Sequence, residues 1–196
     1  MERDYQPLPI RELGAGAGFR RPLQPQSARV SAESPATQVM TDLARVAPAT
    51  IRPQAPLAGA NQFMITRGVR LLLVTDDQEN VLGVVTATDI LSERPMRIAI
   101  ERGMRRDELT VADVMTPAEQ VEAIAYADVE RARVGHVLET LRRAGRQHAL
   151  VIENEGQRAM VRGIFSISQI ARQLGVAVPS GGEVARTFSE IESAIK

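Results

Sequence analysis

The chain of 196 residues contains no cysteine and only two histidines, His136 and His148. Without cysteine there is no disulfide, no thiolate nucleophile and no cysteine-ligated zinc. Two histidines do not make a His-rich metal centre, and no Walker-type phosphate loop is present. No nucleophile–base set surrounds His148. We therefore expect no metal site, no catalytic residues and no enzyme activity.

The chain also lacks an excess of either charge and is poor in aromatic side chains. Its 24 basic and 24 acidic residues give a formal net charge of +0, and aromatic residues make up 3% with no tryptophan. Proteins that coat nucleic acids usually carry a basic excess, and those that stack bases need aromatic platforms. The composition therefore predicts no nucleic acid partner.

Long apolar runs are absent too. Runs such as Leu71–Val74 are far shorter than the roughly 20 residues that a membrane-spanning helix needs. The N-terminus has no apolar segment of the secretory type. We expect a protein of the cytoplasm with no membrane partner.

The two ends of the chain differ from its middle. Residues 1–35 are rich in Pro, Gln, Gly, Ser and Arg without a helix or strand period, which predicts a flexible N-terminal tail or a segment that folds on a partner. Residues 183–195 place Val184, Phe188, Ile191 and Ile195 on one helical stripe. That stripe is expected to pack on its own chain or across a dimer.

Between the ends, one order of elements occurs twice. In the first copy we expect a short helix at 37–44, a strand at 48–51, a helix at 56–67, strands at 69–75 and 81–85, and a helix at 86–92. In the second copy we expect a short helix at 110–115, a strand at 121–125, a helix at 129–144, strands at 148–152 and 160–165, and a helix at 166–174. The shared order of strand, helix, strand, turn, strand and helix is an internal repeat.

The segment between the copies, residues 95–107, contains four arginines. They are Arg97, Arg102, Arg105 and Arg106. We interpret this segment as a solvated linker, with an anion-binding or partner-binding surface as the alternative.

The repeat extends to individual residues. The stretch GVVTATDI, which starts at Gly83, aligns with GIFSISQI, which starts at Gly163. Thr86 then matches Ser166, and Thr88 matches Ser168. In both copies a buried strand therefore runs into a helix through two hydroxyl residues.

This turn fits two interpretations. As a capping box, Thr86 would be the N-cap and Asp89 its N3 partner, and Ser166 with Gln169 would repeat the arrangement. As a ligand site, the helix start would suit phosphate, and Asp89 would accept hydrogen bonds from a ribose diol. Thr86 and Asp89 together then suit the ribose-phosphate end of a nucleotide. Both interpretations can hold at once.

The residues that carry a family resemblance are VMTDL (39–43), GVRLLLVTDDQENVLGVVTATDILSE (68–93), TVADVMT (110–116) and the stretch 145–175. Together they resemble a tandem CBS-domain pair, the Bateman module. The resemblance implies an α/β (α+β) fold of two β-α-β-β-α repeats packed with pseudo-twofold symmetry. The repeats would be 36–95 and 107–176, joined by a linker at 96–106 and followed by a C-terminal helix at 177–196.

The same resemblance implies a function. CBS pairs bind AMP, ADP, ATP or S-adenosylmethionine in clefts between the two copies, and they require no cofactor. The chain would be a stand-alone regulatory module that senses an adenosine-containing molecule, with a homodimer and a protein effector as expected partners. The alternative is a ligand-free dimerisation or interaction scaffold in which the turns only cap helices.

The resemblance also implies site residues, each with a simpler structural alternative. Asp89 would hold the ribose, and Gln169 would do so less well because an amide lacks charge assistance. Adenine would lie against Thr50 and Ile51, which are otherwise an ordinary strand edge. The full set of expected nucleotide-binding residues is Thr86, Asp89, Thr88, Thr50, Ile51, Arg70, Ser166, Gln169 and His148. Arg70 could equally be a solvated surface residue, and His148 a strand-edge residue.

Overall fold

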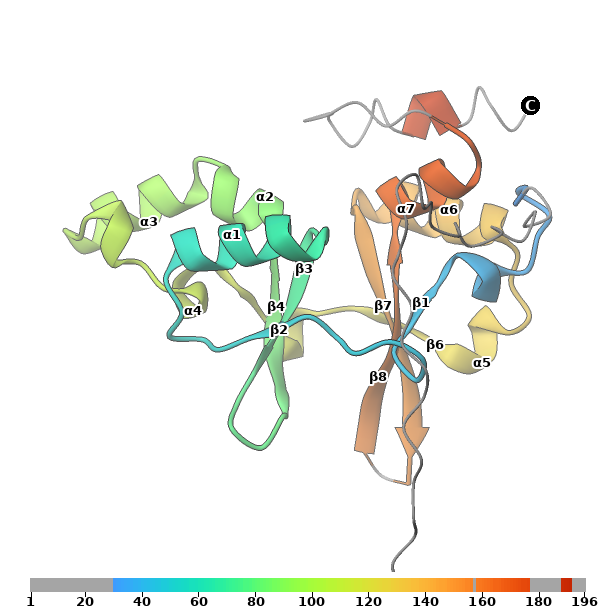
Figure 1. Cartoon of the computed structure of the whole chain (residues 1–196), viewed down its shortest axis with the longest axis horizontal. Coiled ribbons are helices and arrows are strands. Elements are labelled where there is room, and N and C mark those ends of the chain that lie inside the picture. The colour runs from blue at the N-terminus through green and yellow to red at the C-terminus, as the bar shows by residue number, and fades with distance from the viewer. Residues whose placement is uncertain (1–29, 157, 177–187, 192–196) are drawn as a thin grey trace, which may run out of the picture.

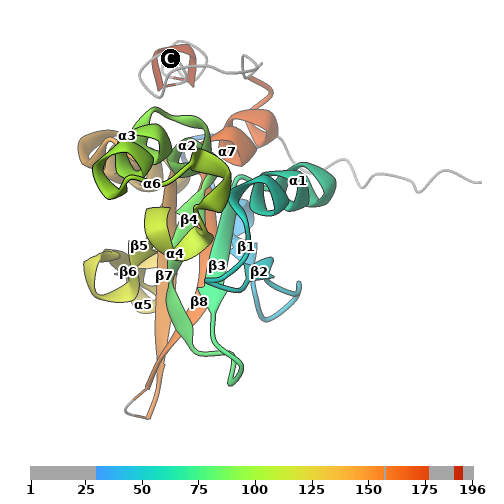
Figure 2. The same cartoon turned by 90° about the vertical axis from the view of Figure 1, so that its left-hand side faces the viewer.

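A computed structural model of the chain describes residues 30–156, 158–176 and 188–191 (Figure 1). Most of the predicted tail, and Val184 and Ile195 of the predicted C-terminal stripe, lie outside these residues. The described residues form two four-stranded sheets with helices packed on them. Figures 1 and 2 show α1, α2, α6 and α7 gathered at one end of two hairpins, whose tips point the other way.

The predicted order of elements is confirmed in both copies. The first contains β2 (Thr50–Ile51), α1 (Leu57–Arg67), β3 (Leu71–Thr75), β4 (Val81–Thr86) and α2 (Ala87–Leu91). The second contains β6 (Ala123–Ala125), α5 (Tyr126–Val129), α6 (Val134–Ala144), β7 (His148–Glu155), β8 (Arg158–Ser166) and α7 (Ile167–Gln173). The remaining elements are η1 (Ala36–Val39), β1 (Thr41–Asp42), α3 (Arg94–Arg102), η2 (Arg106–Glu108), α4 (Val111–Val114), β5 (Thr116–Pro117) and η3 (Ala118–Gln120).

The two hairpins share one register. Leu71 of β3 lies opposite Thr86 of β4, and His148 of β7 lies opposite Ser166 of β8. The ladder shifts register just after Val74 in the first hairpin and just after Val151 in the second. These two residues occupy the same position counted from the start of β3 and of β7. The repeat therefore extends to the irregularities of the backbone.

Each copy donates its first segment to the other copy. β1 pairs with β8, and β5 pairs with β4, so the sheets run β1-β8-β7-β6 and β2-β3-β4-β5. Val39 of η1 is buried in the core of the second sheet, and Val111 of α4 in that of the first. The helix predicted at 37–44 was wrong beyond Val39, because the next residues extend to pair with β8.

The glycine that begins each repeated motif lies where the donated strand crosses. A methyl group on Gly83 would collide with the backbone carbonyl oxygen of Thr116 in β5. On Gly163 it would collide with the side chain of Met40, next to β1. At Gly83, only a residue without a side chain lets the two backbones approach this closely.

Apolar side chains fill three clusters in the described residues. Two lie between a sheet and its helices, and the third lies between the two sheets. Leu72 and Val74 of β3 point into the helix-covered cluster, whereas Leu71 and Leu73 point into the cluster between the sheets. A strand covered on both faces needs an uninterrupted apolar run, which explains the Leu71–Val74 segment.

The predicted linker is mostly helical. α3 begins at Arg94, and Pro95 is tolerated because the first turn of a helix needs no N–H from that residue. Pro95 and Ala99 are buried, and Arg102 forms an ion pair with Asp113 of α4. The sequence predicted a solvated linker face, and the inner face of the segment packs against the first core.

The helix predicted at 129–144 and the end of the N-terminal tail also differ from prediction. The helix expected at 129–144 is divided into α5 and α6, because residues 30–36 bind the chain between them. The N–H groups of Val134 and Gly135 donate to the carbonyl oxygens of Ser34 and Ala32, both at 2.9 Å. Residues 30–35 are therefore fixed to the second copy and are not part of a flexible tail.

The helical turn 188–191 shows where part of the predicted C-terminal stripe packs, on its own chain or across a dimer. Phe188 and Ile191 are buried in the second core, so this part packs on its own chain. Across the described ranges, no helix has the length and apolar character required to cross a bilayer.

We predict that Gly83→Ala lowers the free energy of unfolding by about 2–3 kcal/mol, because β5 must move its backbone. Gly163→Ala should cost about 1 kcal/mol or less, since the flexible Met40 side chain can turn away. Urea denaturation of both variants measures the difference. Gly59→Ala, in open space on α1, is the control and should be neutral or stabilising. Equal losses at Gly83 and Gly163 would contradict the proposed role of the β5 backbone.

Candidate functional site: two clefts between the repeats

Thr86 and Asp89 form the predicted capping box at the start of α2. The Asp89 amide donates to Thr86 Oγ1 at 3.2 Å, and the Thr86 amide donates to Asp89 Oδ2 at 2.9 Å. Thr86 Oγ1 also donates its proton to Asp89 Oδ2 at 2.6 Å. The other carboxylate oxygen, Oδ1, accepts from Arg94 at 3.2 Å. The hydroxyl proton of Thr86 is therefore already engaged within the protein.

An almost identical box occurs at the start of α4. Thr110 and Asp113 make the same backbone and hydroxyl bonds, at 2.8 and 2.9 Å, and Arg102 takes the place of Arg94. Burial opposes ionisation of Asp113, but hydrogen bonds from Thr110 and the charge of Arg102 lower its pKa below the ordinary value. This second box shows that the motif on its own is a structural cap.

The second copy does not form the predicted box. Ser166 makes no side-chain capping bond, and its Oγ lies 3.0 Å from Ser168 Oγ. Gln169 instead accepts a hydrogen bond on Oε1 from Thr41 of β1, at 3.0 Å. The donated strand therefore takes the side chain that would otherwise have closed the box.

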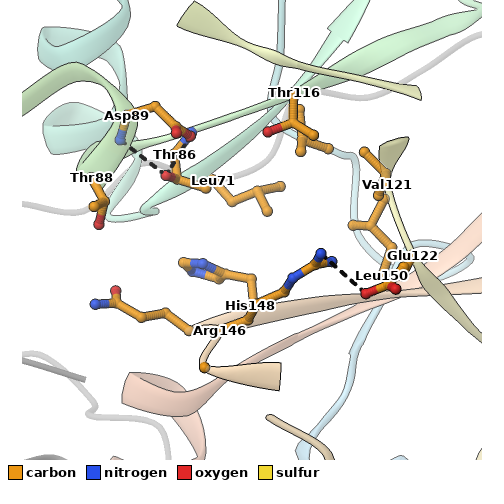
Figure 3. A pocket seen from close by; sticks show the side chains of 13 residues that line it. Leu71, Thr86, Thr88, Asp89, Thr116, Val121, Glu122, Arg146, His148 and Leu150 are labelled. Carbon is orange, nitrogen blue, oxygen red and sulfur yellow. Dashed lines mark hydrogen bonds and ion pairs between the residues drawn. The ribbon is translucent and has the colours of Figure 1, made fainter. Parts of the chain in front are cut away.

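One cavity, of about 330 Å³, lies beside Asp89, and we call it the Asp89 cleft. Figure 3 shows Thr86, Thr88 and Asp89 on one wall and His148 on the opposite wall. The second copy also contributes Arg146 and Glu122, joined by an ion pair of 3.1 Å. The remaining lining residues are Leu71, Val84, Thr116, Val121, Gly145, Gln147 and Leu150.

A second cavity, of about 640 Å³, occupies the matching place beside Gln169, and we call it the Gln169 cleft. Ser166, Ser168 and Gln169 line one side, and residues 47–49 and 67–71 of the first copy line the other. Thr41, Leu43, Val46, His148, Ile164 and Arg172 complete it. Each cleft thus combines the helix start of one copy with the strand entry of the other.

Comparisons with known proteins agree with this arrangement. Residues 36–95 match the family model described as the CBS domain. A conserved protein from Pyrococcus horikoshii superposes with a TM-score of 0.54 at 23% identity, covering 77% of this chain and 99% of that one. The chain folds as a tandem CBS-domain pair.

Two further CBS-pair structures superpose with a TM-score of 0.50. CBSX2 in complex with AMP is 19% identical and covers 71% of this chain and 94% of its own. The CBS-domain pair of protein MJ0100, in complex with 5′-methylthioadenosine and S-adenosyl-L-methionine, is 18% identical, with coverages of 72% and 96%. Among curated protein sequences, none matches the chain.

The predicted nucleotide-binding residues fall into three groups: those that line the Asp89 cleft, those that line the Gln169 cleft, and those that line neither. Thr86, Thr88 and Asp89 line the Asp89 cleft, whereas Arg70, Ser166 and Gln169 line the Gln169 cleft, and His148 lines both. Thr50 and Ile51 are among the lining residues of neither. Their backbone pairs with Leu73 and Val74, and Ile51 packs against the first core, so residues 47–49 just before them form the cleft wall instead.

Several lining residues were missed from the sequence. Thr116 lies in the Asp89 cleft and Thr41 in the Gln169 cleft, at matching places on β5 and β1. Each follows a Val-Met pair in a repeated VMT triplet, which was the available signal. Glu122, Arg146 and Arg172 carried no pattern of their own, because their positions depend on how the two repeats pack.

His148 occupies the place that Leu71 has in the first repeat, between the two clefts. Burial, and to a smaller degree the positive charge of Arg70, lower its pKa to about 4, although the negative charge of Asp89 acts in the opposite direction. The imidazole is therefore neutral at pH 7 and can offer one N–H donor and one nitrogen acceptor.

We predict that His148 makes the folded protein less stable in mild acid. Below pH 6.5 an unfolded chain binds a proton that the folded protein excludes down to about pH 4, so the free energy of unfolding falls by about 1.4 kcal/mol per pH unit across this window. His148→Leu, which copies Leu71, should remove this loss. Denaturation of both proteins from pH 7.5 to 4 measures it. A stability difference that stays constant with pH would show that His148 titrates normally.

Proposed function

We propose that the chain is a regulatory module that binds an adenosine-containing ligand, namely AMP, ADP, ATP or S-adenosylmethionine, in the Asp89 cleft. The observation that carries this proposal is the position of the Thr86–Asp89 box, which forms the wall of a cavity between the repeats. The matching Thr110–Asp113 box is not part of that wall. At about 330 Å³ the cavity lies at the lower end of the range for small-molecule sites.

The chemistry of the cleft suits a nucleoside. Asp89 presents carboxylate oxygens that can accept from ribose hydroxyls, in competition with Arg94. Thr88 and Thr116 are better placed than Thr86 to donate to the ligand, because the Thr86 hydroxyl proton already goes to Asp89. Val121 and Leu150 offer an apolar surface to a base, and the neutral His148 lines the same cavity, two residues before Leu150 on β7.

Similar folds with bound ligands support the adenosine class. The superposed CBS pairs include one in complex with AMP and one in complex with 5′-methylthioadenosine and S-adenosyl-L-methionine. We propose a comparable ligand here, acting as a signal without being turned over, in the cytoplasm.

The signal would travel through the packing of the repeats. Both repeats contribute walls to the cleft, so a ligand that fits one relative placement better shifts the population toward it. We propose a homodimer or a protein effector as the receiver of that shift.

A second candidate function, a ligand-free interaction scaffold, is favoured by apolar side chains on the helical surface. Ile65 of α1 is 64% exposed, Leu91 of α2 is 64% exposed, and Ile100 of α3 is 73% exposed. If this surface forms a dimer, Ile65→Glu combined with Ile100→Glu should yield a monomer of unchanged fold in sedimentation velocity, because a charge cannot be buried unpaired. An unchanged sedimentation coefficient would exclude this surface as the dimer contact.

The decisive experiment compares Asp89→Ala with Asp113→Ala. Each removes a capping carboxylate and its ion pair with an arginine, Arg94 for Asp89 and Arg102 for Asp113, so each should lose about 1 kcal/mol of stability. Only Asp89→Ala should also lose ligand affinity, by about tenfold or more. Thermal-shift measurements with AMP, ADP, ATP and S-adenosylmethionine, followed by calorimetry, test this. At 100 times its dissociation constant a ligand adds about 2.7 kcal/mol to wild-type stability.

If no adenosine ligand stabilises the wild type, or if both variants lose affinity equally, Asp89 is only a helix cap. The scaffold function then becomes the better account of the chain.

A further inference from the structure

α3, which follows α2 at the outer edge of the first repeat (Figure 1), is tied to a capping box at each of its ends. Arg94, its first residue, forms an ion pair of 3.2 Å with Asp89 of α2. Arg102, its last residue, forms an ion pair with Asp113 of α4. Because only the Asp89 box lines a cleft, this helix connects a carboxylate in the cleft wall with a matching carboxylate outside it.

The Asp89 carboxylate has few acceptor positions left. The two oxygens of a carboxylate offer about four positions in all. Oδ2 accepts from the Thr86 amide at 2.9 Å and from the Thr86 hydroxyl at 2.6 Å. Oδ1 accepts from Arg94 at 3.2 Å. With the described residues in place, about one acceptor position therefore remains for a ligand.

A ribose diol that donates both of its hydroxyls to Asp89 needs two positions, so one of the protein's own donors has to leave. The Thr86 amide is fixed by the backbone, and the Thr86 hydroxyl makes the shortest of the three bonds. The Arg94 bond is the longest. The Arg94 side chain is also 40% exposed, so water can solvate its guanidinium once it is released. Arg94 is therefore the donor that a diol displaces at the lowest cost.

The contact that breaks lies at the junction of α2 and α3. Of the described residues, those that line the cavity include Asp89 but not Arg94, so the arginine reaches the carboxylate from outside the cleft. Its amide donates to Ser92 Oγ at 3.3 Å. Farther along α3, Ala99 is buried and Arg102 holds the other end. Release of Arg94 therefore loosens the first turn of α3 and leaves the rest of the helix attached.

The first turn of α3 lies beside exposed apolar side chains. Leu91 at the end of α2, Met96 in the first turn of α3 and Ile100 one turn later are all exposed. Leu91 and Ile100 belong to the surface considered above as the contact with a second copy. A change at the start of α3 therefore reaches a surface that a partner can contact.

We propose that Arg94 is a latch between the Asp89 cleft and α3, and that a ligand with a ribose diol opens it. The second hydroxyl takes the acceptor position of the guanidinium, and the first turn of α3 loosens. A 2′-deoxyribose ligand lacks that hydroxyl, binds at the open position and leaves the latch closed. This inference rests on the proposed function, because the ligand must contact Asp89. Arg94 is then a positioning residue that weakens the preference of the cleft for ribose over deoxyribose.

Calorimetric titration of the full chain with AMP and 2′-deoxy-AMP tests the latch. Arg94→Ala removes the competing donor, so the ratio of AMP affinity to 2′-deoxy-AMP affinity should rise by about two- to fivefold over wild type, as for a partly exposed ion pair. The ratio is measured because the lost positive charge acts on both phosphates alike. Arg102→Ala, which breaks the matching pair outside the cleft, is the control and should leave the ratio unchanged. Arg94→Lys should return it toward the wild-type value.

Hydrogen exchange measures the release itself. The Arg97 amide donates to the Glu93 carbonyl in the first turn of α3, at 3.1 Å. AMP should make this amide exchange faster, whereas 2′-deoxy-AMP should not. In Arg94→Ala the amide should exchange fast without any ligand.

An affinity ratio that is the same in wild type, Arg94→Ala and Arg102→Ala would overturn the latch. A ratio that falls in Arg94→Ala would do so too, because Arg94 would then support the bound diol. In both cases the proposed function survives if Asp89→Ala still abolishes AMP binding. Wild-type protein that binds neither nucleotide would overturn the proposed function and the latch together.

Discussion

The exchange of short strands between the repeats is the contact on which the rest of the structure depends. β1 completes the sheet of the second repeat, and β5 completes that of the first. A glycine lies at each crossing: a side chain on Gly83 would collide with the β5 backbone, and one on Gly163 would displace the Met40 side chain. The exchange also places Thr41 and Thr116 in the two clefts. One feature of the backbone therefore determines both how the repeats are held together and what lines the cavities between them.

The same local chemistry has different consequences at different places. In both the Thr86–Asp89 and the Thr110–Asp113 boxes the threonine amide and hydroxyl donate to the aspartate, but only the first box forms the wall of a cleft. In the second repeat, Gln169 turns toward Thr41 and no box forms. A capping motif becomes a candidate ligand site through its position against the other repeat. For this reason the residues that the other repeat contributes to each cleft carry more information about ligands than either motif alone.

Much of the fold could be predicted from the sequence, because apolar runs, helix-ending glycines and the repeat itself are local signals. Gly68 and Gly145 end α1 and α6 in the left-handed conformation, where glycine is favoured. The donated strands could not be predicted, since Thr41 and Asp42 look like a continuation of a helix until β8 is present to pair with them. Likewise, Thr86, Asp89, Ser166 and Gln169 were found as a motif, but their division between two clefts follows from the packing of the repeats.

The strand exchange also sets the order in which the chain can fold during synthesis. Thr41 pairs with Ile164, and the Thr41 side chain bonds to Gln169, 128 positions later. Thr41 and Asp42 emerge early but have no strand partner until β8 has been made. The first sheet, in contrast, is complete once β5 at Thr116–Pro117 has emerged. Contacts over such long sequence separations close slowly because a large loop must be ordered before they form. During synthesis, β1 can therefore join its sheet only after the rest of the second repeat through β8 has been made.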